Sequence, residues 1–273
     1  MGDVKPKVVL ITGTSSGIGQ ACAQHLARRG CQVFGTSRCL QPGGEEPFEM
    51  ISMDVTDEDS VGQGVATVSA RAGRLDAVVN NAGFGFGGSV EDTSIAEAQE
   101  MFDTNLFGTL CVCRAVLPHL RERRAGTIVN ISSLAGLIGQ PFVGIYCATK
   151  FAMEGATEAL RMKVRPFGIH VVLIEPADTR AGFTANRRRT QASQAASPYA
   201  DNMQRALAVI EHDEHTGCSP EAVARVLGRI LRSRSPRLRY PVASTFQRFA
   251  VVLRKFMPGG LFERMLTQYY RMR

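Results

Sequence analysis

Short runs of β-branched and apolar residues alternate along most of the chain with amphipathic stretches of helical length. Most of these runs are almost continuously apolar, which is typical of strands covered on both faces of a sheet. Repeated strand–helix alternation predicts parallel strands joined by right-handed crossovers. We therefore expect one α/β domain, built as a doubly wound parallel sheet of about seven strands with helices on both faces.

The expected elements cover the chain from residue 8 to residue 242. The predicted strands are Val8–Thr12, Gln32–Ser37, Phe48–Val55, Leu75–Asn80, Thr127–Ser132, His170–Glu175 and Arg237–Val242. The predicted helices are Gly17–Arg29, Asp57–Ala72, Ile95–Arg123, Ala148–Arg165 and Pro220–Ser233. Residues 1–243 are expected to form the domain. Within it, the polar segment 181–197 is interpreted as a mobile loop and residues 181–218 as a lid over the ligand edge, with a plain surface loop as the alternative.

Composition excludes several other classes of protein. With 44% apolar and 21% charged residues among 273, the chain is not disordered, collagen-like or a coiled coil. No apolar run reaches the ~18–20 residues of a membrane-spanning helix, and residues 8–11 are too few for a signal-peptide core. Seven cysteines without a CxxC pair argue against a disulfide framework or a zinc site. We therefore expect no bound metal and a cytoplasmic location.

A glycine-rich turn lies between the first predicted strand and the first helix. Its sequence is Thr12-Gly13-Thr14-Ser15-Ser16-Gly17-Ile18-Gly19. Glycines at such a junction let the backbone turn sharply and approach a pyrophosphate, and the helix N-terminus supplies N–H groups and partial positive charge. The turn therefore predicts a dinucleotide site.

Residues at the ends of the next strands indicate which dinucleotide binds. An NAD site usually has an acid at the end of the second strand, where it binds the ribose 2′-OH. Here no acid lies between the end of the second predicted strand and Glu45. Arg38 instead offers a permanently charged guanidinium for a 2′-phosphate. NADP(H) is therefore expected. Asp54 fits the adenine amino group or caps the following helix, and Asn-Asn-Ala-Gly at 80–83 leaves room for a ribose or forms an ordinary turn.

Tyr146 and Lys150 are four residues apart, which on a helix places them on one face. A phenol with a pKa of ~10 is a poor acid–base catalyst at neutral pH. A nearby ammonium, together with a positively charged nicotinamide, favours phenolate and lowers that pKa. Ser133 ends the fifth predicted strand and is placed to hold a substrate oxygen beside the tyrosine. Asn105, a polar residue in an apolar helix, is a candidate to hold a water that links Lys150 to solvent.

These motifs together resemble those of the short-chain dehydrogenase/reductase family, in its short, non-extended branch. They match in family order over residues 7–180, at Thr12-Gly13-x3-Gly17-x-Gly19, Asp54-Val55, Asn80-Asn81-Ala82-Gly83, Asn105, Ser132-Ser133, Tyr146-x3-Lys150 and Pro176-x2-Thr179. One departure is Ala177, where the family usually has glycine. The resemblance implies a single-domain Rossmann-like fold and hydride transfer between a nicotinamide and a carbonyl/alcohol pair.

The resemblance also implies the role of each matching residue. Tyr146 would be the general acid in reduction and the base in oxidation. Lys150 would lower its pKa and bind the nicotinamide ribose, Ser133 would polarise the carbonyl, and Asn105 would hold the proton-relay water. The implied cofactor-binding residues are Gly13, Ser15, Ser16, Gly17, Ile18, Gly19, Arg38, Asp54, Val55, Asn81, Ala82, Gly83, Tyr146, Lys150, Pro176 and Thr179.

The segments expected to flank the substrate are mostly apolar, and residues 134–145 contain no Arg or Lys. The predicted substrate-binding residues are Phe84, Ser133, Leu134, Phe142, Tyr146 and Phe183. A lipophilic ketone, aldehyde or alcohol therefore fits better than a small acid. Similarity to the hydroxysteroid and retinol dehydrogenase branches suggests steroid-like, retinoid-like or long-chain substrates. A broad-specificity reductase of small ketones, or a non-catalytic NADP-binding sensor or membrane-associated scaffold, is the alternative.

The C-terminal residues carry the positive charge of the chain. Residues 225–273 hold 12 basic residues and one acid, whereas the whole chain has a net charge of +7. Residues 244–273 form an apolar and basic pattern at near-helical spacing, interrupted at Pro258-Gly259-Gly260, and are expected to be an amphipathic helical extension. It packs on its own domain or a partner subunit, or it contacts an acidic membrane surface peripherally. We expect a homodimer, with a tetramer as the alternative, and no binding to nucleic acid.

Overall fold

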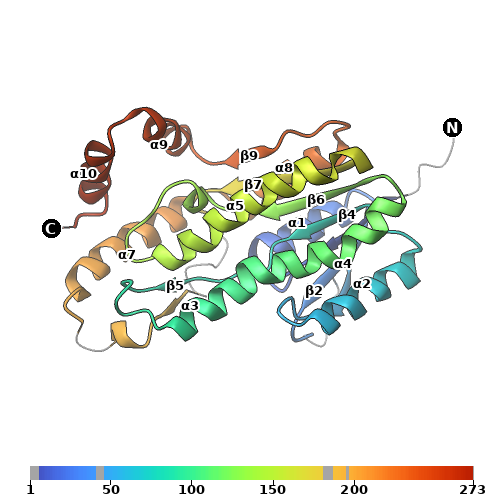
Figure 1. The fold of residues 1–273 in the computed structure, drawn as a ribbon, viewed down its shortest axis with the longest axis horizontal. Helices are drawn as coiled ribbons and strands as arrows, with labels where there is room; N and C mark the ends of the chain where they lie inside the picture. Colours follow the sequence, from blue (N-terminus) through green and yellow to red (C-terminus); the bar gives the residue numbers. More distant parts are fainter. Residues whose placement is uncertain (1–5, 41–45, 181–186, 195–196, 273) are drawn as a thin grey trace.

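The computed structural model describes residues 6–40, 46–180, 187–194 and 197–272. Its main sheet has seven parallel strands in the order β3-β2-β1-β4-β6-β7-β9 (Figure 1). The strands are β1 (Val8–Ile11), β2 (Gln32–Ser37), β3 (Glu49–Ser52), β4 (Ala77–Asn80), β6 (Gly126–Ile131), β7 (Ile169–Pro176) and β9 (Arg239–Val242). The predicted doubly wound α/β sheet is confirmed.

Helices cover both faces of this sheet, as Figure 1 shows. On one face, apolar residues of α1 (Gly17–Ala27) and α8 (Pro220–Arg232) form a core with the strands. On the other face, α2 (Glu58–Ala72), α4 (Gly108–Glu122) and the end of α5 (Gly144–Val164) do the same. The central strands β1, β4, β6 and β7 therefore bury both faces, which explains their largely apolar sequences.

The predicted helix 95–123 is interrupted in the structure. It consists of α3 (Ile95–Phe102), a π-helical turn (Asp103–Phe107) and α4. A π-turn inserts an extra residue into the helical hydrogen-bond pattern, and such turns frequently mark functional sites. Apolar periodicity alone did not detect it, because the flanking helices keep nearly the same direction.

Helix α5 begins at Gly144, four residues before the predicted start at Ala148. The chain enters it through Phe142, whose backbone is left-handed at φ 59°. A left-handed non-glycine residue is uncommon and carries no sequence signal. As a result Tyr146 lies in the first turns of the helix, as the tyrosine–lysine spacing requires.

The predicted lid contains more regular structure than its composition suggested. In the described part, β8 (Arg188–Arg189) pairs in parallel with β5 (Phe86–Gly87), and Thr190 and Ser193 are buried. Residues 187–194 are therefore docked on the domain, which corrects the interpretation of that part as a mobile polar loop. Helix α7 (Ala200–Thr216), which was not predicted from the sequence, lies within the segment 181–218 that was interpreted as a lid. Phe183 lies outside the described residues.

The C-terminal extension forms two helices, α9 (Thr245–Phe256) and α10 (Gly259–Tyr269), with the break predicted at Pro258. In Figure 1 they stand at one end of the molecule, beyond the edge strand β9. Helix α10 packs through Leu266, and Tyr270 just after it, on a small apolar cluster shared with α5 and α7. No helix in the described ranges has the length and apolarity needed to cross a bilayer.

Candidate active site

The glycine turn follows β1 and gives its backbone the shape needed to approach a phosphate. Gly13 and Gly17 have φ of 67° and 61°, a conformation that glycine adopts without a steric cost. A Cβ at Gly19 would overlap the Gly13 carbonyl oxygen and the Asn81 amide. Ser16 stands at the N-cap of α1, where the described structure gives its side chain no capping bond to the helix. The first N–H groups of α1 therefore point toward the turn, which suits a pyrophosphate.

Strand β4 braces this turn from the neighbouring position in the sheet. The Asn81 side chain donates hydrogen bonds to the carbonyl oxygens of Thr12 and Gly13, both at 2.9 Å. The Thr12 hydroxyl accepts in return from the backbone N–H groups of Asn81 and Ala82, at 2.9 and 3.0 Å. The Asn81-Ala82-Gly83 segment thus fixes the glycine turn, which is a more specific role than an ordinary turn.

The two residues proposed for the adenosine end both line the cavity beside this turn. Arg38 is exposed just after β2. Glu46, the first described acid after β2, is held by α1, where Gln20 and Gln24 donate to its carboxylate at 2.8 and 3.0 Å. Asp54 accepts from the backbone and hydroxyl of Thr56 at 2.9 and 2.8 Å. The cap of α2 is Asp57 instead, so the alternative that Asp54 caps this helix is wrong.

One cavity of about 650 Å³ joins the glycine turn to Ser133, Tyr146 and Lys150. It lies at the carboxyl ends of the strands, where open α/β sheets bind their ligands. The lining residues include Gly13, Ser15, Ser16, Gly17 and Ile18 of the turn, Arg38, Asp54 and Val55, residues 81–83, Ser133, Tyr146, Lys150, Pro176 and Thr179. Gly19 supports the turn from behind. The residues present therefore fit a dinucleotide, whose phosphates the α1 terminus would hold.

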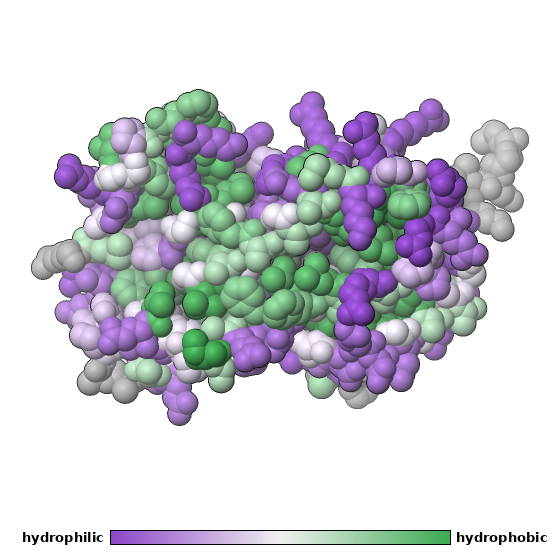
Figure 2. Space-filling view, in the orientation of Figure 1, coloured by the Kyte–Doolittle hydropathy of each residue, from purple (hydrophilic) through white to green (hydrophobic). Residues whose placement is uncertain are grey.

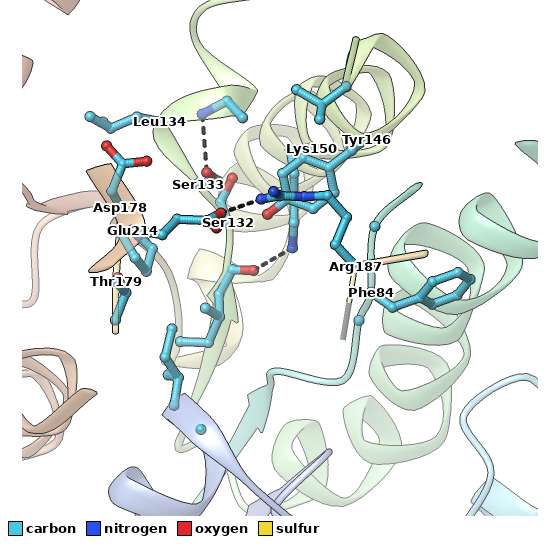
Figure 3. A pocket seen from close by; sticks show the side chains of 18 of the residues that line it. Phe84, Ser132, Ser133, Leu134, Tyr146, Lys150, Asp178, Thr179, Arg187 and Glu214 are labelled. Atoms are coloured by element: carbon cyan, nitrogen blue, oxygen red, sulfur yellow. Dashed lines mark hydrogen bonds and ion pairs between the residues drawn. The ribbon is translucent and has the colours of Figure 1, made fainter. Parts of the chain in front are cut away.

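Ser133, Tyr146 and Lys150 converge on one wall of this cavity (Figure 3). Ser133 lies two residues after β6, at the N-cap of a short 3-10 helix. Its hydroxyl accepts from the Ala135 N–H at 3.1 Å and is hydrogen-bonded to Tyr146. Lys150 Nζ donates to the Ile131 carbonyl oxygen at 2.9 Å. It lies 5.7 Å from the centroid of the Tyr146 ring. The predicted face shared by tyrosine and lysine is therefore present, with the serine beside it.

Burial dominates the protonation of both groups. It raises the pKa of Tyr146 well above its usual range, although the hydrogen bond to Ser133 and the charge of Arg187 act against the shift. It also lowers the pKa of Lys150 to about 8. The predicted lowering of the phenol pKa involves the ammonium together with a bound nicotinamide, and it stays a prediction. In the structure the ammonium donates to a carbonyl oxygen, and burial outweighs the effects that lower the phenol pKa.

Asn105 lies in the π-turn and is completely buried behind the cavity. Its side-chain amide donates to the Phe84 carbonyl at 2.9 Å and to the Thr149 hydroxyl at 3.2 Å, and it accepts from the Phe84 N–H at 3.0 Å. Asn105 therefore fixes the backbone after Gly83 and the helix turn that carries Lys150. Its role in holding a relay water stays a prediction.

The substrate end of the cavity is formed by segments from distant parts of the chain. Phe84 and Leu134 line it as predicted, but Phe142 does not. Because its left-handed backbone turns it aside, Phe142 packs on the apolar cluster of α5 and α7. Further apolar and aromatic lining residues come from α7, α9 and the α10 end, namely Ile210, Phe246, Ala250, Met265, Leu266, Tyr269 and Tyr270.

A buried ion pair crosses this end of the cavity. Arg187 and Glu214 pair with side chains only 5% and 9% exposed, and Figure 3 places Arg187 beside Tyr146 and Phe84. Asp178 and Asp213 line the same region, and burial together with these neighbouring carboxylates raises the pKa of Asp178 to about 6. The absence of basic residues from 134–145 had indicated an apolar pocket, but Arg187 brings a charge from the lid.

Comparison with known proteins agrees with this geometry. The family model described as short chain dehydrogenase matches residues 7–192. The chain belongs to the short-chain dehydrogenase/reductase family. A 3-ketodihydrosphingosine reductase of Bacteroides thetaiotaomicron is 38% identical over 99% of this chain and 100% of its own. Retinol dehydrogenase 8 of Bos taurus is 37% identical over 86% and 80%. The solved short-chain dehydrogenase from Streptomyces avermitilis has a TM-score of 0.80 at 31% identity, with 97% of both chains covered.

As in other short-chain dehydrogenases/reductases, the chemistry is thus gathered at one edge of the sheet, and solved chains of this fold hold NAD or NADP. The sequence analysis missed Arg187 and Glu214. Arg187 belongs to the run Arg187-Arg188-Arg189 and Glu214 to the stretch His212-Asp213-Glu214-His215, and neither was predicted to be a site residue. No group of three or more metal-ligating side chains occurs within the described ranges.

Proposed function

We propose that this oxidoreductase uses NADPH to reduce a ketone on a long-chain or similarly lipophilic molecule. The observation that carries the proposal is the single cavity, which runs from the glycine turn, past Ser133, Tyr146 and Lys150, to an apolar wall under the C-terminal helices. A bound nicotinamide and an extended apolar substrate would meet at the tyrosine.

Several residues of this chain would hold the cofactor. The α1 terminus would bind the pyrophosphate and Asp54 the adenine amino group. Arg38, exposed on the cavity rim, supports NADP(H) over NAD(H), since its guanidinium suits the 2′-phosphate. Lys150 would bind the nicotinamide ribose. The nicotinamide supplies the hydride, and the protein positions the reacting carbon and moves the proton.

In the proposed reduction, Tyr146 would be the proton donor. Its phenol is placed to donate a proton to the carbonyl oxygen while that carbon accepts the hydride, so a ketone becomes an alcohol. Ser133, hydrogen-bonded to the tyrosine, would hold the same oxygen and stabilise the charge that develops on it. Lys150, whose Nζ lies 5.7 Å from the centroid of the tyrosine ring, would stabilise the phenolate that is left.

The substrate class rests on the shape and chemistry of the far wall. Apolar side chains of α7, α9 and α10 line it, whereas the Arg187–Glu214 ion pair provides a charged position near the tyrosine, with Asp178 and Asp213 in the same region. A molecule with a long apolar chain and a polar group close to its ketone matches this arrangement. The names of two relatives, a 3-ketodihydrosphingosine reductase and a retinol dehydrogenase, support the same class.

The test is a comparison of substrates under NADPH oxidation, followed by absorbance. The panel contains 3-ketodihydrosphingosine, a retinoid aldehyde, a steroid ketone and simple ketones such as cyclohexanone. We expect kcat/KM for the best long-chain or polycyclic substrate to exceed that for cyclohexanone by at least about 100-fold, as the burial of several methylene groups implies. Equal kcat/KM values across the panel would contradict the proposed substrate class.

A further inference from the structure

Helix α9 carries an apolar stripe that the described chain leaves in solvent. Phe246, Phe249, Val252 and Phe256 follow one another at intervals of three or four residues, with exposed fractions of 65%, 58%, 51% and 82%. No residue of this helix is buried. Figure 2 shows apolar side chains gathered where α9 lies in Figure 1. A contiguous exposed apolar surface of this kind marks an interaction site.

The opposite side of α9 is fixed to the domain, so the stripe has a defined direction. Ser244 and Gln247 form a capping box at its start. The Gln247 side chain also donates to the Asp178 carboxylate, and the Arg254 guanidinium lies 5.3 Å from the centre of the Phe151 ring on α5. These contacts hold the helix on the molecule with Phe249, Val252 and Phe256 outward, and with Phe246 at the rim of the cavity.

Positive charge flanks the stripe. Arg248 and Lys255 are exposed on the same helix, and residues 244–273 contain six basic residues against one acid, Glu263. A helix with phenylalanines on one side and basic residues beside them suits the interface of a bilayer, where anionic headgroups attract the charges. We propose that α9 docks this protein on an anionic membrane surface, with the stripe inserted at the level of the headgroups.

The docking helix is also a wall of the active-site cavity. Phe246 and Ala250 of α9 line the cavity, as do Met265 and Tyr269 of α10. A lipophilic molecule in the bilayer would therefore reach Tyr146 along these helices without crossing bulk water. This delivery rests on the proposed function, whereas the docking itself depends only on α9.

The experiment measures cosedimentation of the purified protein, without cofactor or substrate, with vesicles of phosphatidylcholine alone or mixed with phosphatidylglycerol. The first variant is Phe249→Ser/Val252→Ser/Phe256→Ser, and the second is Arg248→Glu/Lys255→Glu; neither touches a cavity-lining residue. The matched control is Val90→Ser/Ile95→Ser, which removes apolar residues that are 72% and 82% exposed elsewhere. Circular dichroism and NADPH-dependent turnover of a short water-soluble ketone check that each variant is folded.

We expect the wild-type protein and the control to bind the anionic vesicles and to bind pure phosphatidylcholine at least about tenfold more weakly. The serine variant should lose binding about 100-fold or more, because each buried phenylalanine is worth about tenfold. The glutamate variant should lose the preference for anionic lipid. Failure of the wild-type protein to bind either kind of vesicle would overturn the proposal. A protein that does not bind vesicles but forms a dimer, which the serine variant dissociates, would also overturn it.

Discussion

Lys150 places a positive charge in the interior of the protein. Its replacement by methionine should raise the free energy of unfolding and abolish activity. The residue is 5% exposed, and its ammonium has the Ile131 carbonyl as a hydrogen-bond acceptor at 2.9 Å. Burial lowers its pKa from the ordinary 10.5 to about 8. Since one pKa unit corresponds to about 1.4 kcal/mol, the buried charge costs about 3 kcal/mol of unfolding free energy at pH 7.

The sign of the pH dependence follows from the two pKa values. Below about pH 8, Lys150 is charged in both the folded and the unfolded protein, so the full cost is present. Between about pH 8 and 10.5 the folded protein loses this proton first and the cost shrinks, and above that range it vanishes. Methionine also leaves the Ile131 carbonyl unpaired, at about 1 kcal/mol. The net gain for Lys150→Met is therefore about 2 kcal/mol at pH 7 and none above pH 10.5.

Urea unfolding at pH 7 and pH 10.5 measures this difference, with Lys163→Met on the exposed side of the same helix as the control. We expect Lys150→Met to be more stable than the wild-type protein only at pH 7, and to have lost turnover with NADPH. The control should change neither property. If Lys150→Met were less stable than the wild-type protein at pH 7, or if the difference in unfolding free energy were equal at both pH values, the buried charge would not be the cause.

Three further substitutions test separate parts of the account. Arg38→Asp should raise the Kd of NADPH at least about 10-fold more than that of NADH, because attraction to the 2′-phosphate becomes repulsion; equal losses would argue against NADP(H). Arg239 pairs with the buried carboxylates of Glu154 and Glu175. Arg239→Met leaves these carboxylates without the guanidinium and should lower the free energy of unfolding in urea by about 3 kcal/mol, and by less at pH 5 than at pH 8. The exposed control Arg229→Met should leave this free energy unchanged. Arg187→Met removes a charge that lowers the pKa of Tyr146, so alcohol oxidation should require higher pH; an unchanged pH–rate profile would exclude this influence.

The sequence predicted well those features that depend on neighbouring residues. The glycine turn and Ser133 each combine a local motif with a place just after a strand, and the tyrosine–lysine pair follows from its spacing on one helix. In a parallel sheet that place fixes the edge to which the side chains belong. The central sheet followed in the same way from apolar runs and intervening helices, with differences of a few residues at the ends of elements.

Features that depend on tertiary contacts could not be predicted from local sequence patterns. Arg187 and Glu214 are 27 positions apart, and their pairing depends on the docking of β8 against β5 and on α7, neither of which has a strong local pattern. Phe142 was assigned to the pocket because it is apolar and lies between Ser133 and Tyr146. Its left-handed backbone, which redirects the side chain, follows from packing rather than from its residue type.

The central claim is that the Tyr146 phenol transfers the proton at the end of a nicotinamide site. The most direct test measures NADPH affinity and ketone turnover side by side for Tyr146→Phe, which removes one oxygen from the cavity wall. If Tyr146 transfers the proton, the variant should lose turnover by about 10²–10⁴-fold. Its Kd for NADPH should stay within about threefold of the wild-type value, a change of less than 1 kcal/mol. A phenylalanine variant that reduces the ketone at the wild-type rate would contradict it.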